Sequence, residues 1–493
     1  MEDAADPEAG REGPALGRLG RAALFQLLAR TAVMRGVSFV GSIVLARVLT
    51  PADFGLYAVI AAIVTFLTMF GDLGLPAGLV RQRAEPARRD LATAWTAQQI
   101  VMVTGVVLIW ILAPVLLVIA PDLRPDAVWQ LRVGSLALLF AGLRMLPQLL
   151  LVRALRFGPI AVAEVLMQFS FYAVAIPAAW LGAGAWSFVL ALVAQSAIGT
   201  IVVNLAWKSW PGVAADIATL QRLLRFGLPL QLSTLVNWVS ENAIPLAGTF
   251  AGGVTGIGIL QFASRIAHLA AGIDEIIGRV SFSVMSRLQD DPPRRSRAAG
   301  RVLEATTIAV VAVEGWLIAI APILVPVLFS EKWTPAIVPL QLMAFAAFAT
   351  VPARVLRSLL WASGRSDATL RMAILVAAIS MLLAPPLVAV AGLPGGGIAA
   401  LLGGITSLVL HRRASSGLLG GSWPRVLTIY ASGVLAIAAG SLALAGTGGL
   451  VGLAAATAAF GIAYPALLLV TSRDQVREAW AAVRGRSSAD ASG

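Results

Sequence analysis

The chain has no cysteine and only two histidines among its 493 residues. Without cysteine it can form no disulfide, no thiol nucleophile and no cysteine-ligated metal site. His268 and His411 are too few and too widely separated for a histidine-based metal site. We therefore expect a protein that holds no metal and no cofactor.

Charged residues are scarce as well, and apolar residues are correspondingly frequent. Asp, Glu, Lys and Arg make up 13% of the chain, against about 25% in soluble domains. Hydrophobic residues make up 58%, and the mean hydropathy is +0.85. Since a transmembrane helix needs roughly 20 apolar residues, this composition predicts an all-α polytopic membrane protein. The acidic, polar N-terminus is unlike a cleaved signal peptide, which begins with a basic and then an apolar region.

Polar, glycine and proline residues divide the chain into about fourteen candidate transmembrane helices. Their expected ranges are 22–49, 54–80, 93–120, 127–152, 158–181, 185–207, 224–251, 254–283, 301–329, 334–361, 368–391, 396–412, 424–445 and 449–472. The connections between them are short. We therefore expect no extramembrane catalytic domain and no enzymatic activity.

Lysine and arginine gather in alternate connections of this layout, and such an excess marks the cytoplasmic side of a membrane. These basic residues lie within 81–89, 153–156, 208–225, 287–301, 365–371, 412–425 and 473–486. The other side holds Arg124 and Lys332, with Arg47 at a helix end. We therefore expect both termini in the cytoplasm. The net charge of +12 then reflects topology and contact with anionic lipids, and no nucleic-acid partner is needed to explain it.

A faint internal repeat relates the two halves of the chain. A shift of 203 residues places Gly55 over Gly258 and Asp72 over Glu275. Six predicted helices separate the two copies, so both copies keep the same orientation in the membrane. Repeats of this parallel kind are related by an axis along the membrane normal.

Polar side chains recur at spacings of three, four and seven residues in the leading helices of both copies, and such residues share one helix face. The first, second, seventh and eighth predicted helices carry the polar residues Gln26, Arg30, Thr31, Arg35, Ser38 and Ser42; Thr65, Thr68 and Asp72; Thr234, Asn237 and Glu241; and Gln261, Arg265, His268, Asp274 and Glu275. Charged groups at membrane depth usually face a bundle interior or a water-filled cavity. The stripes therefore predict a shared polar lumen.

Several of these residues allow more than one interpretation. Arg265 either lines a cavity or forms a structural ion pair with Glu241. Asp72, within Gly-Asp-Leu-Gly, either breaks the helix or contacts a substrate. His268 is either a proton carrier or, as we favour, a packing histidine.

Two segments of the chain resemble a known family. Residues 45–82, LARVLTPADFGLYAVIAAIVTFLTMFGDLGLPAGLVRQ, closely resemble the N-terminal signature of bacterial Wzx-type polysaccharide flippases. These flippases belong to the multidrug/oligosaccharidyl-lipid/polysaccharide (MOP) exporter superfamily. Residues 223–269, LLRFGLPLQLSTLVNWVSENAIPLAGTFAGGVTGIGILQFASRIAHL, are similar to the start of that family's C-terminal lobe.

The resemblance implies two six-helix lobes around a central cavity, followed by two further helices. The corresponding segments are a cytoplasmic tail 1–21, an N-lobe 22–207, a linker 208–223, a C-lobe 224–412, two helices within 424–472 and a cytoplasmic tail 473–493. It also implies an inner-membrane protein that moves an undecaprenyl-pyrophosphate-linked oligosaccharide, a precursor of exopolysaccharide, capsule or O-antigen, by alternating access. A polysaccharide polymerase and a chain-length regulator are the implied protein partners.

The candidate residues fall into three groups. The family's cationic cavity implies phosphate-binding roles for Arg30, Arg35 and Arg265, since guanidinium groups match phosphate oxygens. The intramembrane Arg144 is a fourth candidate for this cationic, substrate-binding cavity. Polar lining residues are Ser38, Asn237, Gln261 and His268. Candidates for ion coupling or gating are Asp72, Glu241, Asp274 and Glu275.

Two other functions remain in competition with a flippase. A cation-coupled multidrug antiporter of the same superfamily would use the anionic residues Glu241, Asp72 and Glu275. A membrane glycosyltransferase or polymerase would need a sizeable outer loop, and the predicted outer turns are too short. A proton gradient, a sodium gradient or the membrane potential could drive transport; without a nucleotide-binding loop, direct use of ATP is not expected.

Overall fold

The computed structural model of the chain describes most of its predicted membrane-spanning part. The described residues are 34–75, 79, 85–119, 123–208, 211–270, 285, 291–419, 423–445 and 449–471. Their regular structure is helical throughout, because the backbone N–H and C=O groups of a membrane-spanning segment must be satisfied within the structure itself. This confirms the predicted all-α fold.

The helices follow the predicted spans closely. In the first half of the chain they are residues 34–48, α2 (Pro51–Asp72), α4 (Arg88–Leu112), α5 (Val115–Ile119), α6 (Asp126–Arg153), α7 (Phe157–Trp180) and α8 (Trp186–Ala206). In the second half they are α9 (Ile217–Ala247), η1 (Gly248–Ala251), α10 (Gly253–Ala270), α12 (Pro292–Leu324), η2 (Val325–Phe329), η3 (Glu331–Ala336), α13 (Ile337–Ala362), α14 (Ser366–Ala391), α15 (Leu393–Ala414), α16 (Trp423–Ala445) and α17 (Gly449–Thr471). Among the described residues, 11 helical segments are long and apolar enough to cross a membrane. The helix of residues 34–48, α9 and α10 add to these, in agreement with the expected layout.

Two helices begin earlier than the sequence pattern predicts. Helix α9 starts at Ile217, inside the expected linker 208–223, and α12 starts at Pro292, before the expected 301. Each start is capped by an aspartate: Asp216 accepts a hydrogen bond from the N–H of Ala218, and Asp291 accepts one from the N–H of Arg294. Polar sequence marks the end of the apolar span, but a capped helix continues into it.

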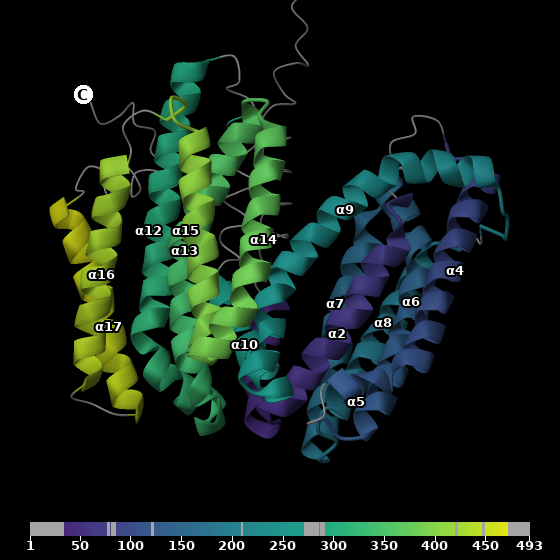
Figure 1. The fold of residues 1–493 in the computed structure, drawn as a ribbon, viewed down its shortest axis with the longest axis horizontal. Helices are drawn as coiled ribbons and strands as arrows, with labels where there is room; N and C mark the ends of the chain where they lie inside the picture. The colour runs from purple at the N-terminus through teal and green to yellow at the C-terminus, as the bar shows by residue number, and fades with distance from the viewer. Residues whose placement is uncertain are drawn as a thin grey trace, which may run out of the picture.

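The helices form two groups that are joined by α9 (Figure 1). Helices α2, α4, α6, α7 and α8 form one group on one side. The second group consists of α12 to α15, together with α10, which packs against α13, and η1, which packs against α14; α16 and α17 pack against α12. Helix α9 crosses obliquely from the side of α4 to α10 and also packs against α14. One long helix therefore contacts both groups.

The two groups meet tightly at one end of the molecule. We call it the closed end and define it by residues 46–55, 254–258 and 327–333. Here α2 and α10 touch backbone to backbone: a Cβ atom on Gly55 would lie 1.8 Å from the Val254 carbonyl oxygen, and one on Gly258 would lie 1.9 Å from the Pro51 carbonyl oxygen. Pro51 and Val254, like Gly55 and Gly258, are 203 positions apart, so the contact is reciprocal in the register of the internal repeat.

Reciprocal capping of helix ends strengthens the closed end. The Arg47 guanidinium donates from Nε to the Leu328 carbonyl at 2.8 Å and from Nη2 to the Val327 carbonyl at 2.6 Å. In return, Lys332 Nζ donates to the Arg47 carbonyl at 2.8 Å. Cations stabilise the unsatisfied carbonyls at helix C-termini, and here each group of helices supplies the cation for the other.

Trp333 is buried inside the closed end and contacts both groups of helices. Its side chain is fully buried, and its indole N–H donates to the Ala46 carbonyl at 2.8 Å. The ring stacks on Phe262 with centroids 4.1 Å apart and meets the edge of Phe54 at 4.9 Å. Aromatic residues from both groups therefore share one packed layer, and such pairs contribute about 0.5–1.5 kcal/mol each beyond the area they bury.

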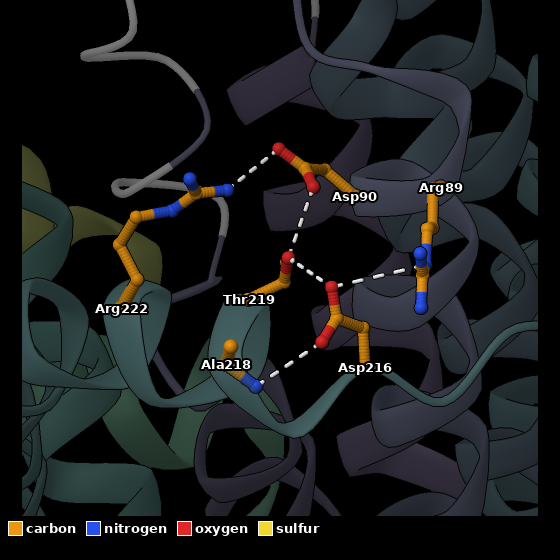
Figure 2. Close-up of polar contacts among 6 residues, drawn as sticks. All are labelled: Arg89, Asp90, Asp216, Ala218, Thr219 and Arg222. Atoms are coloured by element: carbon orange, nitrogen blue, oxygen red, sulfur yellow. Dashed lines mark hydrogen bonds and ion pairs between the residues drawn. The ribbon is translucent and has the colours of Figure 1, made fainter.

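Polar contacts hold the start of α9 against α4, at the end of the molecule opposite the closed end (Figure 2). The Asp90 carboxylate accepts a hydrogen bond from Arg222 Nη2 at 2.7 Å and another from the Thr219 hydroxyl at 3.1 Å. Asp216 and Arg89 form a further ion pair, with Nε and Oδ2 separated by 3.8 Å. These contacts tie α9 to the first group at one end, while its other end packs against α10.

Within these contacts, the pKa of the Asp216 carboxyl is lowered by its hydrogen bonds. The Thr219 hydroxyl donates to Asp216 at 2.9 Å, and this bond, more than the nearby Arg89, holds the pKa of Asp216 below its usual range. A carboxyl with a lowered folded-state pKa stabilises the fold above its unfolded pKa, and this effect is lost only as the pH falls through the lower folded value. The contribution of Asp216 is therefore fully present at neutral pH and is lost only in acid.

We expect Gly258→Ala to loosen the closed end. The added methyl group meets a backbone oxygen that cannot move aside, and overpacking of this kind costs roughly 1–3 kcal/mol. Because the chain lacks cysteine, spin labels on Leu181→Cys and Phe250→Cys, both exposed and on opposite groups, can report the separation by electron double resonance. Gly258→Ala should lengthen and broaden the distance distribution.

Gly461→Ala is the matched control for this experiment. Gly461 lies inside α17, and a Cβ atom there meets nothing within 4 Å. The control should keep the distance distribution of the parent chain. If Gly258→Ala also kept it, the α2–α10 contact would not determine closure.

We expect Asp90→Asn to release the start of α9. Arg222 is 60% exposed, so the lost ion pair is worth only about 1 kcal/mol after screening. Amide hydrogen exchange over residues 217–224 should therefore speed up about fivefold. Asp367→Asn, which also changes a first-turn aspartate, on α14, should leave these amides unchanged; equal exchange in both variants would contradict the anchoring role of Asp90.

Candidate functional site

A cavity of about 280 Å³ lies between the two groups of helices, next to the closed end. Its walls come from the helix of residues 34–48, through Ser42, and from α2, α9 and α10. These are the four helices that carry the polar stripes in the sequence. The structure therefore brings parts of all four stripes to one cavity.

The walls formed by α2 and α10 are related by the repeat but differ in chemistry. Ala58 and Ala62 of α2 line the cavity, and their equivalents 203 positions later are Gln261 and Arg265 of α10, which line it too. Methyl groups on one wall leave room for the long polar side chains on the other. The polar character of the site thus comes mainly from the second copy of the repeat.

The wall formed by α9 adds Trp238, Glu241 and Asn242. The Asn242 amide donates to the Trp238 carbonyl of its own helix at 2.9 Å, which holds that side chain along α9. The Trp238 ring lies 5.2 Å from the ring of Phe66 on α2. The side chain of Asn237, a predicted lining residue, lies outside the described part of the structure.

Arg265 and Glu241 line the same cavity without pairing. Both side chains are exposed, and neither makes a hydrogen bond or ion pair with any residue that the structure describes. Tyr57, at the cavity wall, lies within electrostatic range of Arg265. Arg265 thus lies on the cavity wall, and within the described part of the structure it forms no ion pair with Glu241.

The first helix contributes less to this cavity than its stripe predicts. Ser42 lines it, but Ser38 is engaged elsewhere: its hydroxyl accepts a hydrogen bond from Gln168 at 3.0 Å, and its carbonyl accepts one from Tyr172 at 3.0 Å, both on α7. Arg35 is half-buried and is not among the lining residues. It lies two turns before Ser42, about 10 Å further from the closed end.

Arg144 lies apart from the cavity. Its Nη1 contacts the Met167 sulfur at 2.9 Å, and it occupies the space left by the missing side chain of Gly199 on α8. The guanidinium therefore packs among α6, α7 and α8 within the first group of helices. Sequence depth alone could not distinguish this arginine from Arg265, because both lie inside apolar spans.

Two other candidates bond locally or end a helix. His268 Nδ1 contacts the Ser264 carbonyl at 2.7 Å, one turn earlier on α10, and the ring is exposed. Asp72 is the last residue of α2, which ends in a left-handed turn at Leu73. The helix-break interpretation of Asp72 agrees with this end. Arg30, Asp274 and Glu275 lie outside the described residues.

Sequence reasoning missed the aromatic part of the site. Tyr57 and Trp238 both line the cavity but were not among the candidates, because only polar stripes were followed. Trp238 lies three positions before Glu241 and four before Asn242, so it shares their helix face. A search that included aromatic residues at this spacing would have found it.

The chemistry of the site is that of a binding pocket. Among the residues that the structure describes, no group of three or more His, Asp or Glu side chains comes together to hold a metal ion. The cavity offers one guanidinium, one carboxylate, amides, hydroxyls and aromatic rings. Such a lining can bind a ligand that carries both an anionic group and hydroxyl groups.

Solved structures with this fold are membrane transporters. The lipid II flippase MurJ in an inward closed conformation matches 92% of this chain and 100% of its own, with a TM-score of 0.76 at 13% identity. An inward-facing multidrug resistance MATE family transporter of the MOP superfamily matches 79% of this chain and 98% of its own, with a TM-score of 0.60 at 17% identity.

Curated relatives agree at the level of sequence. The succinoglycan biosynthesis transport protein ExoT of Rhizobium meliloti (strain 1021) is 26% identical over 63% of this chain, and the match spans less than two thirds of the relative, 63%. The lipopolysaccharide biosynthesis protein WzxC of Escherichia coli (strain K12) is 24% identical over 76% of this chain and 75% of the relative.

The family comparison rests on the segment that builds the cavity. Residues 44–338 match the family model described as "Polysaccharide biosynthesis protein", and this segment contains α2, α9 and α10 with their complete cavity walls. The match covers more than half of the 493 residues. The chain therefore belongs to the polysaccharide biosynthesis protein family.

Proposed function

We propose that this protein translocates an undecaprenyl-pyrophosphate-linked oligosaccharide across the bacterial inner membrane by alternating access. The oligosaccharide is a repeat unit of exopolysaccharide, capsule or O-antigen. In this proposal Arg265 binds the pyrophosphate in the cavity between the two groups of helices. The polyprenyl chain stays in the lipid, and the sugar occupies the polar lumen.

The observation that carries the proposal is the guanidinium of Arg265, which has no ion-pair partner among the residues that the structure describes. A charged group within a membrane protein normally finds an opposite charge or water, and Arg265 lines a cavity with no anionic partner among the described residues. A pyrophosphate supplies about two negative charges and oxygens that match the guanidinium fork. The binding of such a ligand would satisfy Arg265.

A path for the ligand follows the first helix. Arg35 and Ser42 are seven positions apart on one face of it, and Ser42 lines the cavity. In our proposal Arg35 meets the phosphate on its way from the end opposite the closed end. The ligand would then pass from one arginine to the next.

The arrangement of basic residues supports an orientation. Arg88 and Arg222 lie at the starts of α4 and α9, and Arg412 and Arg425 lie at neighbouring ends of α15 and α16, all at the end opposite the closed end. By the positive-inside rule we place this end, and both termini, in the cytoplasm. The closed end then faces the periplasm, where a polymerase and a chain-length regulator would receive the product.

We expect Arg265→Met to lower the initial rate of translocation about 30-fold or more. The loss of one partner in a desolvated charge pair typically costs 2–5 kcal/mol. The assay reconstitutes the protein with a labelled undecaprenyl-pyrophosphate-linked sugar and follows the access of a membrane-impermeant oxidant to that sugar. The rate should also fall as salt rises, because the attraction is partly electrostatic.

Arg144→Met is the matched control. It removes the other intramembrane arginine, which packs away from the cavity, so its effect should appear in thermal stability and not in the affinity for the ligand. A rate for Arg265→Met equal to that of the parent chain, in a monodisperse preparation, would refute the proposed phosphate site.

A multidrug antiporter is the second candidate, because Glu241 lines the same cavity. A cationic drug would pair with this carboxylate. Deletion of the protein should then raise susceptibility to cationic drugs, and Glu241→Gln should do the same. If deletion of the protein alters the surface polysaccharide but does not change drug susceptibility, the antiporter hypothesis is wrong.

A further inference from the structure

Two side chains of opposite charge lie on different walls of one cavity. Arg265 belongs to α10 and Glu241 to α9, and both line the cavity. Each is exposed and makes no hydrogen bond or ion pair within the described part of the chain. A simple anion would pair with Arg265 but would be repelled by Glu241. The lining therefore fits a ligand with two chemically different parts.

The two charges differ in depth. Arg265 lies twelve positions after the start of α10 at Gly253, about 18 Å along that helix from the closed end. Glu241 lies six positions before the end of α9 at Ala247, about 9 Å from the same end. Measured along each helix, the carboxylate is therefore closer to the closed end than the guanidinium.

The wall around Glu241 has the chemistry of a sugar site. Trp238 offers an aromatic surface beside the carboxylate, and the Asn242 and Gln261 amides lie on the same cavity. A carboxylate accepts hydrogen bonds from neighbouring hydroxyls, and an aromatic ring packs against the apolar face of a pyranose. A phosphate near Arg265 and a sugar ring near Glu241 would satisfy both walls at once.

We propose that the wall formed by Trp238, Glu241 and Asn242 binds the sugar ring attached to the pyrophosphate, and that Glu241 selects a ring without a carboxylate. This inference rests on the proposed flippase function. A neutral or amino sugar donates hydroxyl or ammonium hydrogens to Glu241. A uronic acid would place a second carboxylate against the first, and like charges in a low-dielectric site repel strongly.

The size of the cavity limits this selection to one ring. Its volume of about 280 Å³ lies just below the roughly 300–1,000 Å³ of small-molecule sites. A phosphate and a single ring fill such a space, and further sugars must lie outside it. The protein therefore discriminates the first sugar and tolerates variation in the rest.

The test measures the binding of two synthetic lipids to the full-length protein in nanodiscs. One lipid is undecaprenyl-pyrophosphate carrying N-acetylglucosamine, and the other carries galacturonic acid. The parent chain should bind the first about tenfold more tightly. Glu241→Gln should bring the ratio of the two affinities close to one, mainly because the uronic acid binds better.

Two further variants sharpen the result. Asn242→Asp adds a carboxylate to the same wall and should raise the preference above tenfold, which a misfolded protein could not do. Glu331→Gln removes an exposed carboxylate at the closed end, outside the cavity lining, and should keep the parent preference. Thermal unfolding of each variant confirms that it is folded.

The outcomes separate this inference from the proposed function. If Arg265→Met binds both lipids as the parent chain does, the phosphate site itself is wrong. If Arg265→Met weakens both but Glu241→Gln keeps the tenfold preference, only the sugar subsite is overturned. If Glu241→Gln keeps the preference and changes the dependence of binding on sodium or protons, Glu241 is an ion-coupling residue instead.

Discussion

The backbone contact between α2 and α10 is the constraint on which the rest of the structure depends. Gly55 faces the Val254 carbonyl and Gly258 faces the Pro51 carbonyl, so the helices approach more closely than any side chain would allow. That approach brings the two groups of helices together at one end. It also brings together the two helices that form facing parts of the cavity lining, from Phe54 to Thr65 on α2 and from Gln261 to Ile266 on α10.

The internal repeat supplies a symmetric frame, and the function comes from departures from that symmetry. The glycines that close the molecule are equivalent in the two copies. Further along the same helices, Ala62 in the first copy corresponds to Arg265 in the second. Both residues line the cavity. The small Ala62 side chain leaves space on the α2 wall, and the Arg265 guanidinium places a charge on the α10 wall. Two identical walls would have either the space or the charge, but not both.

The fold could be predicted from the sequence because membrane-spanning helices are recognisable by their length and their apolar composition. The spans, the alternation of basic connections and the register that pairs Gly55 with Gly258 all follow from the residues. The helix ends at Ile217 and Pro292 could not be predicted. Polar composition marks where a span leaves the membrane, but capping by Asp216 and Asp291 decides where the helix begins.

The candidate site was only partly predictable. Gln261 and Arg265 follow from polar spacing on α10, and the structure places both on the cavity. Ser38 lies on a polar stripe and Arg144 lies inside an apolar span, yet both pack among the helices of the first group. Neither the depth of a residue in the membrane nor the spacing of polar residues shows which helix will pack against a given helix face. That packing depends on contacts between helices that are far apart in the sequence.

The central claim is that the cavity between the two groups binds the charged head of a lipid, with Arg265 at the phosphate. An electron cryomicroscopy structure of the protein with undecaprenyl-pyrophosphate-N-acetylglucosamine tests it most directly. The account predicts phosphate density within hydrogen-bond distance of the Arg265 guanidinium, between the α2 and α10 walls. Head-group density elsewhere, with the cavity filled only by water, would contradict it.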